Sequence, residues 1–229
     1  MDTGRFIGLI ARSLLQPHKR RVFGQSTVRN GVQAVIGAAM FSISGSTAVH
    51  DVDGEWSNFA TSGSINSTNG VEDTVASGGF MGRPDGLPIF FARIRLEQIT
   101  DVRFWAGLTD FAGGSFMASD DPTQHEALFR FSTGAGDTTF QCVRNDNSGG
   151  GTIVDSGVTV QASTVYELMI RFVTSGKIQW WINGALVLEA TTTNMPSTSA
   201  AFGNICEIRA LAAAVKNLRI QSLNGSMNA

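Results

Sequence analysis

Histidine and acidic residues are the side chains of this sequence best suited to chemistry, and their spacing argues against a catalytic centre. Three histidines occur, none beside a Ser or Cys nucleophile and none in the H-E-x-x-H spacing of a zinc site: His18, His50 and His125. Retaining glycoside hydrolysis needs two carboxyl groups close together across the sugar, and the sequence has no E-x-D-x-x-E spacing to supply them on one strand. We therefore expect a protein that is not an enzyme, with no catalytic residue and no cofactor.

Two short acidic runs are candidates for a calcium site. Asp51, Asp53 and Glu55 alternate in "HDVDGEW", and Asp120 and Asp121 are adjacent in "ASDDP". Calcium takes several converging oxygen ligands, and neither run has the twelve-residue loop pattern that supplies them. We expect solvated loop acids and no metal site, with bound calcium as the alternative.

The two cysteines, Cys142 and Cys206, are too few for a disulfide framework and lack the spacing of a metal site. Both fall on apolar strand positions, in "TFQCVRN" and "ICEIRAL". We expect two buried free thiols, and a bridge between them is the alternative.

Alternation of apolar and polar residues from about residue 87 predicts the elements that must position any site. In residues 87–97, one face holds four apolar side chains: Phe90, Ala92, Ile94 and Leu96. The same period-2 pattern recurs in short segments separated by Gly, Asn, Asp and Ser turns. This pattern predicts an all-β fold, an antiparallel β-sandwich or jelly roll.

The stretch "KIQWWINGALVLEA" (177–190) predicts a hairpin with Asn183-Gly184 as its two-residue turn. Adjacent strand residues point to opposite faces, so Trp180 and Trp181 cannot share one core. We expect Trp180 in the core facing Val187, and Trp181 covered by protein from outside the sandwich. The alternative is a sugar stacked on an exposed indole, for which the candidate residues are Trp181 and Trp105.

The N-terminal fifty residues differ from the rest of the chain. Residues 1–30 carry six basic groups against one acidic group, whereas the whole chain has a formal charge of −2. We expect residues 1–50 to form an extended arm with one short helix, and residues 51–229 to form the sandwich. The arm should dock on other copies of the chain rather than on nucleic acid or a membrane, because the remainder is acidic. The expected interface residues are Phe6, Leu9, Ile10, Leu14, Lys19, Arg20, Arg21 and Trp181.

Residues 85–222 resemble a known family through three stretches: "AGLTD" (106–110) at a strand end, a "DSGV" turn (155–158) before a "YELMIRF" strand (166–172), and a "WINGALV" hairpin (181–187). The resemblance is to the concanavalin-like (laminin-G-like) β-sandwich modules of tailed-bacteriophage virion structural proteins. It implies a non-enzymatic, homo-oligomeric protein of the virion surface, made in the host cytoplasm. Its partners would be a major capsid protein or an appendage protein, in a capsid decoration (cement) or a fibre. The alternative is a lectin-like receptor-recognition module that binds a host glycan.

Overall fold

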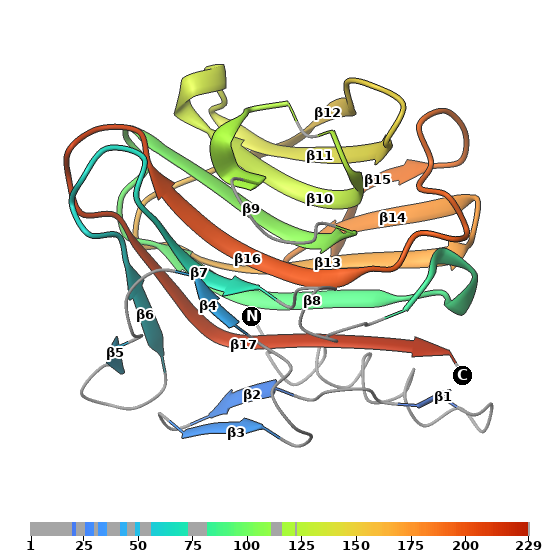
Figure 1. Cartoon of the computed structure of the whole chain (residues 1–229), viewed down its shortest axis with the longest axis horizontal. Coiled ribbons are helices and arrows are strands. Elements are labelled where there is room, and N and C mark those ends of the chain that lie inside the picture. The colour runs from blue at the N-terminus through green and yellow to red at the C-terminus, as the bar shows by residue number, and fades with distance from the viewer. Residues whose placement is uncertain are drawn as a thin grey trace.

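The computed structural model describes five short strands within residues 1–50 as backbone, and then residues 56–72, 82–110, 116–121 and 123–228. Its strands pair antiparallel throughout and form two large sheets and one small one (Figure 1). The helices among the described residues are three-residue 3-10 turns: Pro84–Gly86, Phe116–Ala118 and Thr133–Ala135. None of these helices could span a membrane.

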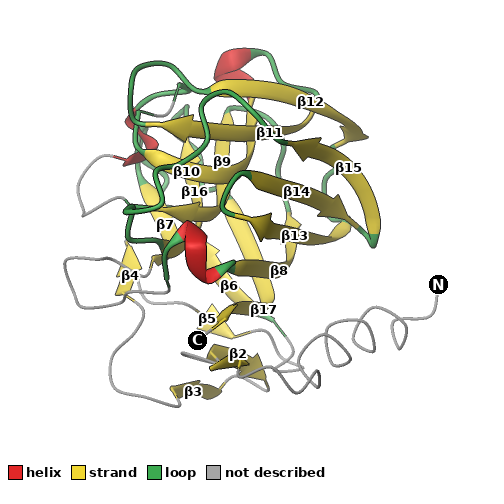
Figure 2. Cartoon of the chain, turned by 90° about the vertical axis from the view of Figure 1, so that its right-hand side faces the viewer, coloured by secondary structure: helices red, strands yellow, loops and turns green. Residues whose placement is uncertain are grey.

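The two large sheets stack as layers, which Figure 2 shows from the side. In order, the eight-stranded sheet contains β15 (Ala185–Ala190), β14 (Lys177–Ile182), β13 (Val165–Thr174), β8 (Ile89–Leu96), β17 (Asn217–Asn228), β6 (Ser57–Ala60) and β5 (Val49–His50), with β1 (Arg20–Arg21) also on β17. The seven-stranded sheet contains β12 (Thr152–Thr159), β11 (Thr139–Asp146), β10 (His125–Ser132), β9 (Val102–Thr109), β16 (Gly203–Ala210), β7 (Thr68–Glu72) and β4 (Ser42–Ser44). A separate hairpin contains β2 (Ser26–Arg29) and β3 (Val32–Val35). The predicted all-β sandwich is confirmed.

The core lies between the two large sheets and follows the predicted alternation. On β8, the four apolar residues of one face are fully buried: Phe90, Ala92, Ile94 and Leu96. They pack against aromatic side chains of the facing sheet, where Phe140 makes edge-to-face contacts with Phe104 and Phe129 and, across the core, with Tyr166 of β13. Edge-to-face packing is the favoured geometry of aromatic pairs, and it adds to the free energy of apolar burial.

The predicted hairpin is present, and its turn has the expected backbone. Asn183 and Gly184 both have positive φ, 50° and 79°, as a tight two-residue turn requires. Trp181 faces Leu186 as expected, but Trp180 faces Leu188 and not Val187, because the register shifts between the two tryptophans. The adjacent indoles still point to opposite faces, and both Val187 and Leu188 pack against the core beside this irregularity.

Two further expectations differ from the structure or lie beyond it. "DSGV" is part of strand β12 rather than a turn, and Gly157 there has φ of 72°. Strands from residues 1–50 pair with both large sheets, through β1 and β5 on one and β4 on the other. The division of the chain at residue 50 stays a prediction, and the expected short helix lies outside the described residues.

The two cysteines are free and buried, as expected. In the pairing register, Cys142 lies opposite Phe129, which lies opposite Ala106, which in turn lies opposite Cys206. Three strand spacings of about 4.8 Å separate the two cysteines, whereas a disulfide needs Cα atoms within about 7 Å. A bridge between them is therefore excluded in this fold, and burial raises the pKa of both thiols.

Trp180 connects the two sheets. Its side chain is fully buried, and its indole Nε1–H donates to the backbone carbonyl of Leu128 at 3.1 Å. Trp180→Ala should lower the free energy of unfolding by about 3–5 kcal/mol, because it leaves a large cavity and an unpaired carbonyl. Trp180→Phe should lower it less, since most of the apolar volume remains. Urea denaturation of both variants measures this difference, and a loss below about 1 kcal/mol for Trp180→Ala would contradict the assignment of Trp180 to the core.

Candidate functional site

The outer face of the seven-stranded sheet collects charged and polar side chains on neighbouring strands. In one cross-strand row, Arg130 of β10 lies opposite Trp105 of β9, which lies opposite Glu207 of β16. The next row holds Arg103 of β9 opposite Arg209 of β16. Such groups on an outer sheet face normally contact solvent, yet all of these except Arg209 are buried.

Residues 116–121, here called the covering segment, lie over this face. Met117 is 2% exposed and joins a second apolar cluster on the outer side of the sheet, which contains Trp105, Leu128, Val143 and Ile205. Because this cluster is separate from the inter-sheet core, β9 is buried on both of its faces. Trp105 therefore lies beneath Met117 with none of its surface exposed.

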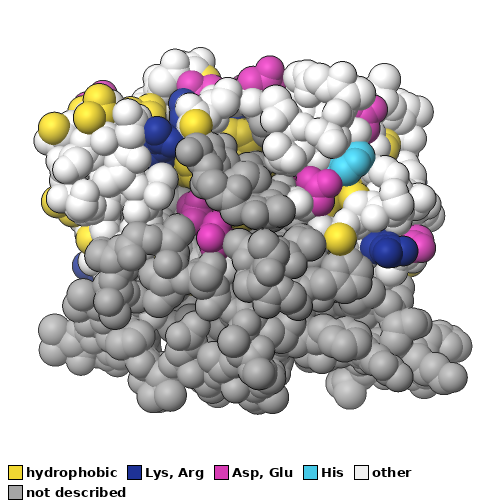
Figure 3. Space-filling model, viewed as in Figure 1, with side chains coloured by type: hydrophobic (Ala, Val, Ile, Leu, Met, Phe, Trp, Pro, Cys, Tyr) yellow, Lys and Arg dark blue, Asp and Glu magenta, His cyan; other side chains and the backbone are white. Residues whose placement is uncertain are grey.

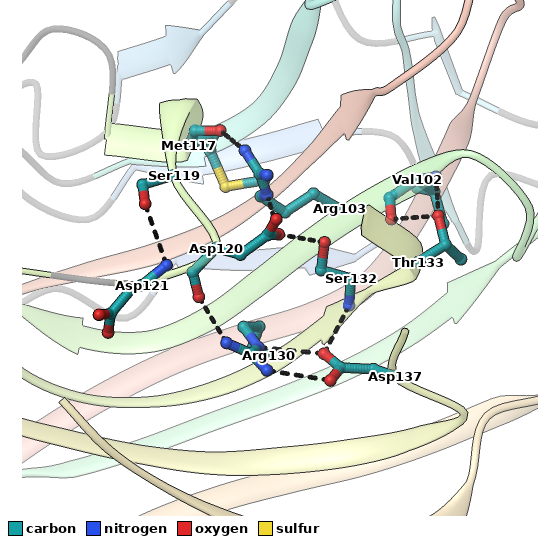
Figure 4. A network of polar contacts seen from close by, with 10 residues as sticks. All are labelled: Val102, Arg103, Met117, Ser119, Asp120, Asp121, Arg130, Ser132, Thr133 and Asp137. Atoms are coloured by element: carbon teal, nitrogen blue, oxygen red, sulfur yellow. Dashed lines mark hydrogen bonds and ion pairs between the residues drawn. The ribbon is translucent and has the colours of Figure 1, made fainter. Parts of the chain in front are cut away.

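Arg103 pairs with Asp120 of the covering segment, and Arg130 pairs with Asp137 in the turn after β10 (Figure 4). Arg103 Nε donates to Asp120 Oδ1 at 2.7 Å, and Arg103 Nη1 donates to the carbonyl of Met117 at 2.5 Å. Arg130 donates through Nε and Nη2 to both carboxylate oxygens of Asp137, at 3.0 and 2.9 Å. Its Nη1 donates to the carbonyl of Asp120. The bidentate geometry at Arg130 is the stronger and more directional form of an arginine–carboxylate pair.

The electrostatics of Asp120 follow from these contacts. Burial by itself would raise the pKa of the Asp120 carboxyl group. Hydrogen bonds from Arg103 and Ser132, with the charges of Arg103 and Arg130, outweigh burial, so the pKa lies below its usual value. Asp120 is thus held as a carboxylate by the sheet that it covers.

Glu126 is in the opposite situation. It lies on the same outer face of β10, opposite Thr109 and Asn145, and is fully buried. Neither carboxyl oxygen has a hydrogen-bond partner among the described residues. Burial raises the pKa of Glu126 well above its usual value, and the charges of Asp110 and Asp121 raise it further. Glu126 is therefore a buried carboxylic acid that resists ionisation.

The outer face of the eight-stranded sheet is different, because apolar surface there contacts solvent. Trp181 is half-buried and Leu186, opposite it, is 46% exposed. The indole nitrogen of Trp181 is buried without a hydrogen-bond partner among the described side chains and backbone, so what the ring exposes is carbon surface. Polar groups lie in the adjacent row, where Glu189 accepts hydrogen bonds from Lys177 at 2.9 Å and from Gln179 at 2.6 Å.

The residues that the sequence predicted for glycan binding and for an interface lie in different parts of the chain. Trp181 lies on the solvent-facing side of its hairpin, whereas Trp105 could contact a sugar only if Met117 moved away. The backbone of Arg20 and Arg21 forms β1 on the end of β17, and the other expected interface residues lie outside the described residues: Phe6, Leu9, Ile10, Leu14 and Lys19. The assignment of these positions to an interface stays a prediction.

The acidic runs give no metal site within the ranges that the structure describes. No cluster of three potential ligands from His, Cys, Asp and Glu is present in those ranges. Asp120 is engaged by Arg103, and Asp121 Oδ1 accepts from the backbone N–H of Gly151 at 3.2 Å. The run from Asp51 to Glu55 lies outside the described residues.

Sequence reasoning missed the charged groups of the seven-stranded face, namely Arg103, Arg130, Arg209 and Glu126. The available signal was a charged residue between apolar neighbours, as in "VRFWA" and "LFRFS". That pattern alone predicts solvent-facing arginines on a half-buried strand. It does not reveal that a distant segment of the chain covers them.

On the face shown in Figure 3, the charged side chains of the described residues are scattered and form no continuous patch of one sign. Broad electrostatic attraction therefore does not mark a binding surface on this side. A binding site on this side has to be identified from the contacts and burial of individual residues.

No protein-family model matches this sequence, and no curated protein matches it. Solved structures do share its fold. The carbohydrate recognition domain of Emp47p has a TM-score of 0.64 at 8% identity, over 92% of this chain and 98% of that one. Alginate lyase A1-II′, a member of polysaccharide lyase family 7, has 0.55 at 13%, over 93% and 96%. A chain of botulinum neurotoxin type C has 0.56 at 9%, over 90% of this chain and 47% of that one.

These structures confirm the concanavalin-like β-sandwich, and their low identities show the fold alone. They also correct the expectation that the chain is not an enzyme. Three of the similar structures are alginate lyases, so the fold is one that carries enzymes, and the missing E-x-D-x-x-E spacing does not exclude catalysis. The expected link to phage virions stays a prediction.

The buried acid Glu126 makes a prediction about pH. A carboxyl group whose pKa is raised by folding weakens the folded state as the pH rises above its usual value of 4.5, because the unfolded chain ionises and the folded chain does not. Glu126→Gln removes this effect. The variant should match the parent near pH 4 and become more stable towards pH 7, with a difference growing by at most about 1.4 kcal/mol per pH unit.

Chemical denaturation between pH 4 and pH 8 measures the difference. Glu189→Gln is the control, because hydrogen bonds from Gln179 and Lys177 lower the pKa of Glu189, so its substitution should not stabilise the protein at high pH. Identical pH profiles for the parent and Glu126→Gln would contradict a buried neutral acid at this position.

Proposed function

We propose that this chain is a carbohydrate-binding β-sandwich and that its glycan binds the outer face of the eight-stranded sheet around Trp181. The observation that carries the proposal is the partly exposed carbon surface of Trp181 beside the exposed Leu186. Contiguous apolar surface with polar groups at its rim often marks a binding site. A pyranose ring presents a face of C–H groups that stacks on an indole.

The neighbouring polar groups fit the rest of a sugar. Glu189 supplies carboxylate oxygens, while Gln179 and Lys177 supply donors. Gln179 and Glu189 form the row next to Trp181, and Lys177 bonds to Glu189 from beyond that row. Sugar hydroxyls both donate and accept, so a mixed set of donors and acceptors can fix the orientation of a stacked ring. Lys177 and Glu189 already pair with each other, which favours a neutral glycan over a charged one.

The fold gives this proposal general support. The similar structures include a carbohydrate recognition domain, and a neurotoxin whose cell entry depends on interaction with two ganglioside molecules. The sandwich is therefore a scaffold on which other proteins bind glycans. The face around Trp181 is our assignment for this chain.

A structural role in a phage virion is a second proposal. It rests on the resemblance of residues 85–222 to virion modules and on strand pairing at the N-terminal end of the chain. β1 pairs with β17, and β2 lies against the same strand. An N-terminal region joined to the sandwich in this way could attach the module to a capsid or to an appendage, where the Trp181 face would meet a host glycan.

The test is a glycan array followed by titration of the strongest neutral ligand with the full chain and with Trp181→Ala. We expect the substitution to weaken the Kd at least about tenfold, since stacking on one aromatic side chain is worth roughly 1–3 kcal/mol where it has been measured for nucleobases. Ile65→Ala is the matched control, because Ile65 is 60% exposed and lies in a loop beyond β6. Its affinity should equal that of the parent.

Two results would overturn the proposal. One is the absence of any glycan that binds the parent protein. The other is a ligand that binds the Trp181→Ala variant as tightly as the parent, which would place the site elsewhere.

A further inference from the structure

Two arginines lie directly opposite each other at one end of the seven-stranded sheet. Arg103 of β9 and Arg209 of β16 are cross-strand partners, and both point to the outer face. Side chains in such a pair have Cβ atoms about 5 Å apart, and like charges placed this way destabilise a sheet. Burial lowers the pKa of Arg209, and the charge of Arg103 lowers it further.

The acidic groups around this pair satisfy only one of the two arginines. Asp120 pairs with Arg103 at 2.7 Å, and Asp137 pairs with Arg130. Arg209 has no carboxylate partner in the described part of the chain, and its Nε is buried without a hydrogen-bond partner there. The two guanidinium groups of this pair therefore have one paired carboxylate between them, that of Asp120.

The surroundings leave this position accessible from outside. The side chain of Asp120 is 30% exposed, while that of Arg103 is 7% exposed, so the carboxylate lies at the solvent side of the pair. A Cβ atom on Gly134 would lie 3.2 Å from Asp120 Oδ2 and 3.2 Å from Leu211 Cδ1. Gly134 thus packs closely against Asp120, and the half-buried side chain of Arg209 is the part of the arginine pair that solvent reaches.

We propose that Arg103 and Arg209 form a binding site for an anionic group, and that its ligand is the carboxylate of an acidic sugar. The bound carboxylate accepts hydrogen bonds from the solvent-facing side of the half-buried Arg209 guanidinium and compensates the repulsion between the two guanidinium groups. Arginine suits this role because its planar donors match a carboxylate in two-point geometry. The site goes beyond the neutral-glycan surface proposed for Trp181, and it lies on the opposite sheet.

The experiment uses the full chain and calorimetric titration with trigalacturonate, with maltotriose as the neutral comparison. Trigalacturonate should bind the parent, and Arg209→Gln should weaken that binding at least about tenfold. Arg171→Gln is the matched control, since Arg171 lies on the eight-stranded sheet away from this pair, and its affinity should stay within about twofold of the parent. Asp120→Asn should strengthen binding, because it removes the competing negative charge.

Thermal melting of each variant checks that it is folded. Arg209→Gln should melt no lower than the parent, because it removes a like-charge contact. Arg209→Lys retains the charge without the planar donors and should give an intermediate affinity. Inorganic sulfate at matched ionic strength should displace trigalacturonate only at roughly hundredfold higher concentration.

The proposal is overturned if the parent does not bind trigalacturonate, or if Arg209→Gln binds it as the parent does. Equal competition by inorganic sulfate would overturn the assignment to a sugar. Trp181→Ala separates this site from the other one, because it should leave the affinity for trigalacturonate unchanged while it weakens neutral-glycan binding.

Discussion

Trp180 spans the space between the two sheets, where its indole N–H donates to the backbone carbonyl of Leu128. Around this bond, alternate residues of the long strands β8, β9, β10, β13 and β16 form the shared apolar core. The remaining residues must point away from it, because the side-chain period of a strand is two. Any group of the sandwich strands that meets a ligand therefore lies on an outer face, at a sheet edge or in a loop.

The outward-pointing side chains of the two sheets differ in what covers them. The seven-stranded sheet buries arginines beneath the covering segment, and desolvated charges of this kind are tolerated only when they are paired and hydrogen-bonded. Arg103 and Arg130 meet that condition through Asp120 and Asp137, whereas Glu126 meets it by staying protonated. The eight-stranded sheet instead leaves part of the carbon surface of Trp181 in contact with solvent, where we propose that a ligand covers it.

Sequence patterns predicted the parts of this architecture that depend on local chemistry. The alternation of β8 and the Asn183–Gly184 turn follow from period-2 burial and from the backbone needs of a tight turn. The register shift opposite Val187 and the pairing of Arg103 with Asp120 could not be predicted, because they depend on contacts between residues that no short pattern relates. Trp105 shows the consequence: its outward position was predictable, but its burial under Met117 was not. Function was the least predictable, since the same fold carries both glycan-binding proteins and lyases.

The most direct test of the central claim is to map a bound neutral oligosaccharide by nuclear magnetic resonance on the isotope-labelled full chain. The four tryptophans give separate side-chain signals, which report on both outer faces and on the core. We expect the ligand to shift the ring signals of Trp181 and the side-chain signals of Gln179 and Leu186, and to leave those of Trp105 and Trp180 unchanged. Shifts centred on Trp105 and Met117, with Trp181 unaffected, would contradict it and would place the glycan under the covering segment.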